Sequence, residues 1–293
     1  MRNHPLFKAY LALAAVCFFW GTTYLGIRVA LEMLPPTVLV ALRYVLSGGI
    51  LLVAALLTGA RLPRGRELWT TAGYGILMLG VGNGCLAFAE QRISSGLAAL
   101  FITTSPFWMV GFEALVPGGA KPRWPTVFGM VVGFLGVGFL ISPKAGEWDP
   151  NLIAGFLLLQ VGNFGWSLGS IVTRRAVSTV HSTVSGAIQQ LATGLAFAGP
   201  ALLIPHEPIH WNWRGVAGVA WLVVFGSIVA FSAYLYALDR LPVAVISMYT
   251  YVNPLVAVTL GWLVYREPFG LREAAAMVII FLGVAIVKRT TRH

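Results

Sequence analysis

The chain has 293 residues, of which 58% are hydrophobic and only 10% are charged. A soluble domain cannot bury this much apolar surface, so the composition excludes a soluble fold and indicates an integral membrane protein. The formal net charge of +10 would fit a nucleic-acid partner, but the positions of the basic residues argue against one.

Ten apolar runs follow one another along the chain, and each is long enough to cross a membrane as a helix. The predicted spans cover residues 9–30, 36–58, 68–89, 94–116, 124–142, 151–172, 182–204, 214–237, 242–265 and 271–288. Their connections are short, so no soluble domain is expected. The first run holds Trp20 rather than a small-residue cleavage site, which favours a first span over a cleaved signal.

The basic residues are distributed unevenly across the predicted membrane. If the N-terminus is cytoplasmic, thirteen Lys and Arg residues lie in inner segments and six in outer segments. This bias is typical of integral membrane proteins, whose cytoplasmic loops are enriched in positive charge. The charge therefore indicates membrane orientation and no nucleic-acid partner, and ten spans place both termini in the cytoplasm.

The two halves of the chain resemble each other at a nearly constant offset. Landmarks recur 146 to 148 residues apart, namely Trp20 and Trp166, FLGV at 134–137 and 281–284, Arg92 and Arg240, and Pro106 and Pro254. The predicted repeats are residues 9–142 and 151–288. Since five spans is an odd number, the second repeat must be inverted, and inverted repeats are typical of secondary transporters with a substrate site between the halves.

Aromatic and polar side chains near the middle of several spans are the candidate substrate-binding residues. Tryptophan normally lies at the membrane interface, so the mid-span residues Trp20 and Trp166 indicate a cavity wall or tight helix packing. The predicted substrate-binding set is Trp20, Tyr24, Asn83, Phe101, Ser105, Trp108, Asn163, Trp166, Ser227, Tyr234, Tyr249 and Asn253. Interhelical hydrogen bonding and packing remain the alternative role for these side chains.

Two prolines lie near the middle of their spans. Pro106 and Pro254 remove a backbone donor, which frees the carbonyls of Ile102 and Thr250. Freed carbonyls must face protein or a wet cavity, because lipid cannot hydrogen-bond them. The prolines are predicted structural or gate residues, with a simple packing kink as the alternative.

Several segments together resemble the drug/metabolite transporter superfamily, EamA-type branch. They are FFWGTTYLGIRVALEMLPPTVLVALRYVLSGGILL, GLAALFITTSPFWMVGFEALV, ISMYTYVNPLVAVTLGWLVYREPF and FLGVAIVKR. The resemblance implies ten helices around a central cavity, with the fifth and tenth more peripheral. It also implies export of amino acids, related metabolites or amphipathic drugs, and the aromatic-rich interior looks most like the exporters of aromatic and neutral amino acids. The second repeat departs from the first, because Gln189 replaces Arg43 and Ser170 replaces Tyr24.

Arg43 lies about seven residues inside the second span, roughly 10 Å deep at 1.5 Å per residue. A charge at that depth is costly in lipid. Three roles fit it: reaching the outer interface, bracing helix-end carbonyls or Glu90 near the outer mouth, or binding a substrate carboxylate. The family resemblance favours the brace, so Arg43 is predicted to be structural or part of a gate.

The sequence holds no histidine or carboxylate near a span centre, which favours downhill efflux over proton coupling. It also shows no metal-ligand cluster, cofactor motif or catalytic constellation, so an enzyme is not expected. The small-xxx-small segment at 129–133 favours helix packing, in a monomer or a weak homodimer.

We therefore predict an all-α exporter of small amphipathic metabolites in the bacterial inner membrane, most of all of amino acids, working by alternating access. A channel or lipid-translocating pore, and a proton-coupled multidrug carrier, are the alternatives.

Overall fold

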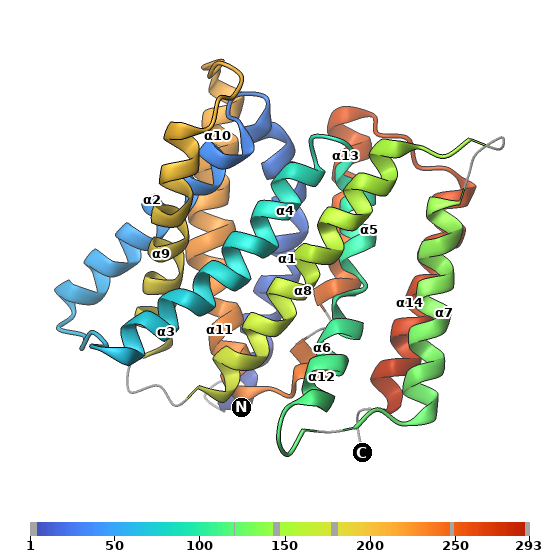
Figure 1. Cartoon of the computed structure of the whole chain (residues 1–293), viewed down its shortest axis with the longest axis horizontal. Coiled ribbons are helices and arrows are strands. Elements are labelled where there is room, and N and C mark those ends of the chain that lie inside the picture. Colours follow the sequence, from blue (N-terminus) through green and yellow to red (C-terminus); the bar gives the residue numbers. More distant parts are fainter. Residues whose placement is uncertain (1–4, 120, 143–146, 177–180, 247–248, 291–293) are drawn as a thin grey trace.

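A computed structural model describes residues 5–119, 121–142, 147–176, 181–246 and 249–290 (Figure 1). The first half of the described chain forms α1 (Pro5–Leu31), α2 (Pro36–Leu57), α3 (Arg66–Gly75), η1 (Ile76–Val81), α4 (Gly82–Ala89), α5 (Ser95–Ile102), α6 (Ser105–Leu115) and α7 (Trp124–Ile141). The second half forms α8 (Pro150–Arg175), α9 (Ser182–Leu203), α10 (Trp213–Trp221), η2 (Leu222–Val229), α11 (Ala230–Arg240), α12 (Val243–Ile246), α13 (Tyr249–Tyr265) and α14 (Leu271–Thr290).

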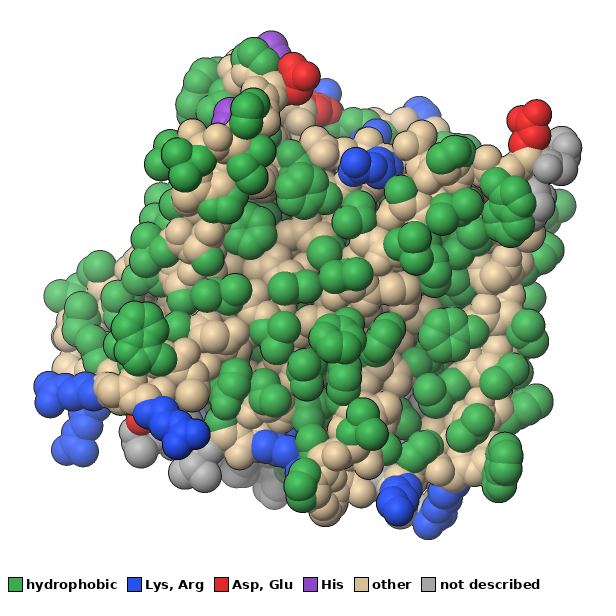
Figure 2. All heavy atoms as spheres, viewed as in Figure 1, with side chains coloured by type: hydrophobic (Ala, Val, Ile, Leu, Met, Phe, Trp, Pro, Cys, Tyr) green, Lys and Arg blue, Asp and Glu red, His purple; other side chains and the backbone are tan. Residues whose placement is uncertain are grey.

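The expectation of a helical membrane protein is confirmed. The described residues of each of the ten predicted ranges are mainly helical, and seven of the described helical spans are long and apolar enough to cross a membrane. Figure 2 shows a broad band of hydrophobic side chains over the helices, with Lys and Arg side chains along its lower edge. Exposed apolar side chains of this kind are what a lipid-facing surface requires.

Local sequence determines where several helices begin. Pro36 opens α2, where its fixed φ suits the first helical turn and its missing N–H has no cost. The side chain of Asp149 accepts hydrogen bonds from the backbone N–H groups of Asn151 and Leu152 and so caps α8. Asn212 caps α10 in the same way through the N–H of Gly215, at 2.7 Å.

Two π-helical segments interrupt the third and eighth spans. The segment η1 runs from Ile76 to Val81 and η2 from Leu222 to Val229, so Leu222 follows Ile76 by 146 residues, the offset of the sequence repeat. A π-helix accommodates an extra residue per turn and occurs frequently at functional sites. Both segments supply side chains to the cavity described below.

The helices pair according to their positions in the two repeats. The second span packs on the seventh as α2 on α9, and the fifth packs on the tenth as α7 on α14. Similarly, α1 packs on α13 while its counterpart α8 packs on α5 and α6. The pair α7 and α14 stands at one edge of the molecule, and α1 and α8 lie in its middle (Figure 1).

Glycines allow the paired helices to touch through their backbones. A Cβ added to Gly48 would lie 2.4 Å from the backbone nitrogen of Leu191, and one added to Gly194 would lie 2.5 Å from that of Val45. In the other pair, a Cβ on Gly283 would lie 2.4 Å from the nitrogen of Gly133, within the 129–133 small-residue segment. That segment therefore packs against a helix of the same chain.

We expect Gly48→Val to lower the melting temperature in detergent by several degrees, because α2 and α9 would have to separate. Overpacking of this kind typically costs about 1–3 kcal/mol. The control is Gly49→Val, one residue along the same helix, where an added Cβ meets no heavy atom within 4 Å. Equal melting temperatures for the two variants would contradict the close α2–α9 packing.

Candidate functional site

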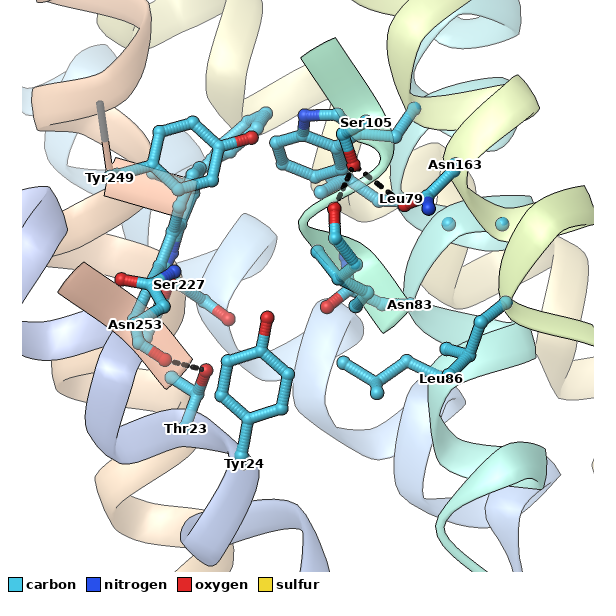
Figure 3. A pocket seen from close by; sticks show the side chains of 18 of the residues that line it. Thr23, Tyr24, Leu79, Asn83, Leu86, Ser105, Asn163, Ser227, Tyr249 and Asn253 are labelled. Atoms are coloured by element: carbon cyan, nitrogen blue, oxygen red, sulfur yellow. Dashed lines mark hydrogen bonds between the residues drawn. The ribbon is translucent and has the colours of Figure 1, made fainter. Parts of the chain in front are cut away.

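A cavity lies among α1, α2, η1, α4, α5, α6, α8, η2, α11 and α13. Figure 3 shows Thr23, Tyr24, Ser227, Tyr249 and Asn253 on one side of it, facing Leu79, Asn83, Leu86, Ser105 and Asn163 on the other. Nine predicted substrate-binding residues line this cavity: Trp20, Tyr24, Asn83, Ser105, Asn163, Trp166, Ser227, Tyr249 and Asn253. Phe101, Trp108 and Tyr234 do not line it.

Trp20 is the centre of an aromatic cluster at the cavity wall. Its ring centroid lies 5.2 Å from Trp166, 5.1 Å from Tyr249 and 5.0 Å from Tyr234. Its indole nitrogen donates to the carbonyl of Gly226 in η2, at 3.0 Å. Tyr234 lies within the cluster rather than on the cavity surface, and its hydroxyl is 2.9 Å from the hydroxyl of Ser170. The two repeat-related tryptophans are therefore in direct contact.

The fourth span is broken next to Pro106, as α5 ends at Ile102 and α6 begins at Ser105. The hydroxyl of Ser105 donates to the carbonyl of Ile102 at 2.8 Å, so the carbonyl that the proline frees is hydrogen-bonded again. The same hydroxyl lies 2.6 Å from the amide oxygen of Asn163.

Asn163 in α8 completes this repair from outside the span. Its amide nitrogen donates to the hydroxyl of Thr104 at 2.9 Å and to the carbonyl of Phe101 at 3.3 Å. The side chain is 3% exposed and also lines the cavity. Asn163 therefore both hydrogen-bonds the polar groups at the break of the fourth span and presents a polar group to the cavity.

The break explains why the predicted face of Phe101, Ser105 and Trp108 is not continuous. The two residues between α5 and α6 change the direction of the side chains, so the helical spacing of four and three no longer holds. Phe101 is fully buried against Phe156, with ring centroids 5.3 Å apart. Trp108 donates its indole N–H to Gln160 at 3.0 Å, away from the cavity. Neither of these two predicted residues lines the cavity.

Pro254 has a different effect from Pro106, since α13 continues through it from Tyr249 to Tyr265. The neighbouring Asn253 is 2% exposed. With its amide oriented to satisfy both polar atoms, its nitrogen donates to the carbonyls of Cys17 at 3.1 Å and Tyr249 at 3.0 Å. Asn253 thereby ties α13 to α1 at the cavity.

Arg43 neither reaches the outer interface nor pairs with Glu90, so two of its three expected roles do not fit the structure. Arg43 is only 5% exposed, so it does not reach the outer interface, and its Nε donates to the hydroxyl of Ser227 at 2.8 Å. Glu90 is fully buried elsewhere, and its backbone carbonyl accepts a hydrogen bond from Arg28 at 2.5 Å. The guanidinium of Arg43 lines the cavity instead, 4.9 Å from the ring centroid of Tyr44.

Tyr44 is a cavity residue that the sequence reasoning missed, together with Thr23, Leu79, Leu86, Leu159 and Phe231. Its position directly after Arg43 is the one feature of the sequence that could have indicated its place at the cavity. The aliphatic and aromatic members could not be separated by sequence from residues that face lipid. In the part of the chain that the structure describes, no three His, Cys, Asp or Glu side chains come together as a metal site requires.

The model of the EamA-like transporter family matches residues 7–142 and again residues 153–289. The chain belongs to the EamA-like transporter family. The two matches coincide with the two halves described above and together cover almost the whole chain.

Relatives of this EamA-like chain include a protein named as an inner membrane transporter. It is 33% identical to "Uncharacterized inner membrane transporter YedA" of Escherichia coli strain K12, over 98% of this chain and 92% of that protein. It is 28% identical to "Protein PecM" of Dickeya dadantii, over 92% of this chain and 88% of PecM. The family and the apolar helices identify a multi-pass transporter of the bacterial inner membrane.

A solved crystal structure shares the fold. It aligns with a TM-score of 0.71 over 97% of this chain and 99% of that chain, at 24% sequence identity. At that identity the likeness supports the arrangement of the helices, and substrate and mechanism must be argued from the cavity of this chain.

Proposed function

We propose that this EamA-like transporter exports small amphipathic metabolites, chiefly amino acids and among them aromatic ones. The observation that carries the proposal is the mixed lining of the central cavity. Rings of Trp20, Trp166 and Tyr249 offer apolar surface, while Asn83 and Ser227 offer hydrogen-bonding groups.

Alternating access is the mechanism we propose for this export. It is supported by the matching positions of η1 and η2, which give each half a pliable segment beside the cavity. It is also supported by the contact between Trp20 and Trp166, since rocking of one half against the other would separate these rings. On this proposal the aromatic cluster around Trp20 is one gate of the cavity.

The inverted orientation of the halves, with both termini in the cytoplasm, is part of the proposal. The start of α1 and the end of α14 lie at the same edge of the molecule (Figure 1), and Lys and Arg gather along that edge (Figure 2). The positive-inside bias then makes this edge cytoplasmic. Reporter fusions after Arg123 and after Thr290 should both report a cytoplasmic location, and opposite sides would contradict the proposed topology.

Counterflow tests the proposed function directly. Vesicles containing the purified protein and loaded with unlabelled phenylalanine should take up labelled phenylalanine transiently above equilibrium, and initial rates should saturate. Both results are expected because a carrier opens its binding cavity to only one side of the membrane at a time. Linear rates without counterflow would favour a channel or pore instead.

The same vesicles test the proposed downhill mechanism. In the described part of the chain, no Asp or Glu side chain lines the cavity, and the buried Glu90 lies outside its lining. A proton gradient alone should therefore drive no uphill accumulation, and Glu90→Gln should retain counterflow. Uphill accumulation that an uncoupler abolishes would contradict the downhill mechanism while leaving the transporter function intact.

A further inference from the structure

Arg43 is a buried cation without an anion. Its Nε bonds the hydroxyl of Ser227, but the two terminal nitrogens of the guanidinium make no hydrogen bond within the described residues. No described acidic side chain lies within ion-pair distance of Arg43, and none lines the cavity. A buried charge without a counter-charge is energetically costly, so an anion that enters the cavity should bind here.

Tyr44 adds a second free donor at the same place. The side chain is 1% exposed and lines the cavity beside Arg43, yet its hydroxyl has no hydrogen-bond partner among the residues that the structure describes. Buried hydroxyls are nearly always hydrogen-bonded, so an unpartnered one at a cavity wall indicates a ligand atom. The free groups of both residues are donors suited to the same kind of acceptor.

The guanidinium is held in position by groups from three helical elements. Ser227, which accepts from its Nε, belongs to η2. The backbone carbonyl of Ser227 accepts from Gln190 of α9 at 3.3 Å, and the side-chain oxygen of Gln190 accepts from Ser47 of α2 at 2.5 Å. The adjacent carbonyl of Gly226 holds the indole of Trp20. Arg43 and Trp20 are therefore both hydrogen-bonded to η2, at the neighbouring residues Ser227 and Gly226.

Building on the proposed function, we propose that Arg43 and Tyr44 bind the carboxylate of the substrate. The terminal guanidinium nitrogens donate to the two carboxylate oxygens, and the tyrosine hydroxyl donates to one of them. The side chain of the substrate then packs on the aromatic cluster around Trp20. The site thus selects amino acids and related monocarboxylates. It rejects amides and amines with the same side chain because they bring no carboxylate to offset the charge of Arg43.

Ligand-induced stabilisation of the purified protein tests this carboxylate site without any transport step. Phenylalanine, leucine and 3-phenylpropionate should raise the melting temperature, whereas phenylalaninamide and leucinamide should not. Arg43→Gln should weaken carboxylate binding on the order of 30-fold or more and remove the discrimination against amides. Tyr44→Phe should weaken it about three- to tenfold. Arg175→Gln, which removes a surface arginine paired with Glu113, should bind like the wild type.

Tyr44→Phe keeps the test decisive even if Arg43→Gln does not fold, because the hydroxyl that it removes bonds nothing in the described structure. The proposal is overturned if amides stabilise the wild type as well as the acids do. It is also overturned if no carboxylate at millimolar concentration stabilises the protein, or if Tyr44→Phe binds acids and amides with unchanged affinity. Carboxylate binding without counterflow would instead contradict the transport function and leave the binding site intact.

Discussion

Trp166→Ala is expected to weaken the binding of aromatic amino acids about ten- to a hundredfold. The indole lines the cavity and lies 5.2 Å from Trp20 and 5.4 Å from Tyr234, so its loss removes both a wall and one partner of the cluster. Losing about 60–100 Å² of apolar contact with the substrate costs about 1.5–2.5 kcal/mol, which is about ten- to seventyfold in affinity. Competition against labelled phenylalanine in counterflow should show leucine losing less affinity than phenylalanine.

Trp108→Ala is the matched control for this substitution. It removes the same side chain from a place outside the cavity, where the indole bonds Gln160 and stacks beside Phe112 and Phe164. Trp166→Phe, which retains a ring, should recover part of the lost affinity. If Trp108→Ala changes the order of substrates and Trp166→Ala does not, substrates bind outside the central cavity.

The helical spans and much of the cavity could be predicted from the sequence because lipid imposes simple rules. Long apolar runs have few alternatives to membrane helices, so hydropathy alone found the ten ranges. An amide side chain at mid-span is costly in hydrocarbon, and Asn83 and Asn163 are for that reason found facing the interior. The sequence repeat then indicated that Trp166 is the counterpart of Trp20.

Other features depended on backbone geometry that periodicity does not contain. The prediction for Phe101 and Trp108 assumed one continuous helix, whereas the chain is interrupted between Ile102 and Ser105. The segments η1 and η2 change the register of side chains in the same manner, so the spacing of seven from Ser227 to Tyr234 does not bring both to the cavity. Sequence shows that a proline or a glycine-rich stretch is present, but the new direction of the helix depends on tertiary packing.

Arg43 shows the limit of the repeat as a guide. The repeat offset varies from 146 to 148 residues, so it pairs Arg43 with either Gln189 or Gln190, and the structure shows that Gln190 is the one that bonds Ser227. The two halves therefore supply one charged and one neutral side chain to the same residue of η2. The resulting cavity is asymmetric in charge although its surrounding helices pair symmetrically, which suits a substrate with one carboxylate.

Asn163→Ala is expected to destabilise the protein by about 2–4 kcal/mol. The substitution removes hydrogen bonds to Ser105, Thr104 and the carbonyl of Phe101, all at the break of the fourth span. Each interhelical hydrogen bond in a membrane protein contributes about 1 kcal/mol, so losing these three costs about 3 kcal/mol, although Thr104 and Ser105 keep hydrogen bonds within their own span. Thermal unfolding in detergent should show a clear fall in melting temperature.

Asn83→Ala separates this structural effect from an effect of the cavity. Asn83 also lines the cavity, but it makes no side-chain hydrogen bond within the described residues. Its loss should leave the melting temperature nearly unchanged while weakening substrate binding, because only a ligand-facing group has been removed. A large thermal effect of Asn83→Ala, or a normal melting temperature for Asn163→Ala, would contradict the view that Asn163 holds the broken span together. Since the same break directs Ser105 into the cavity, we expect Asn163→Ala to weaken substrate binding as well as stability.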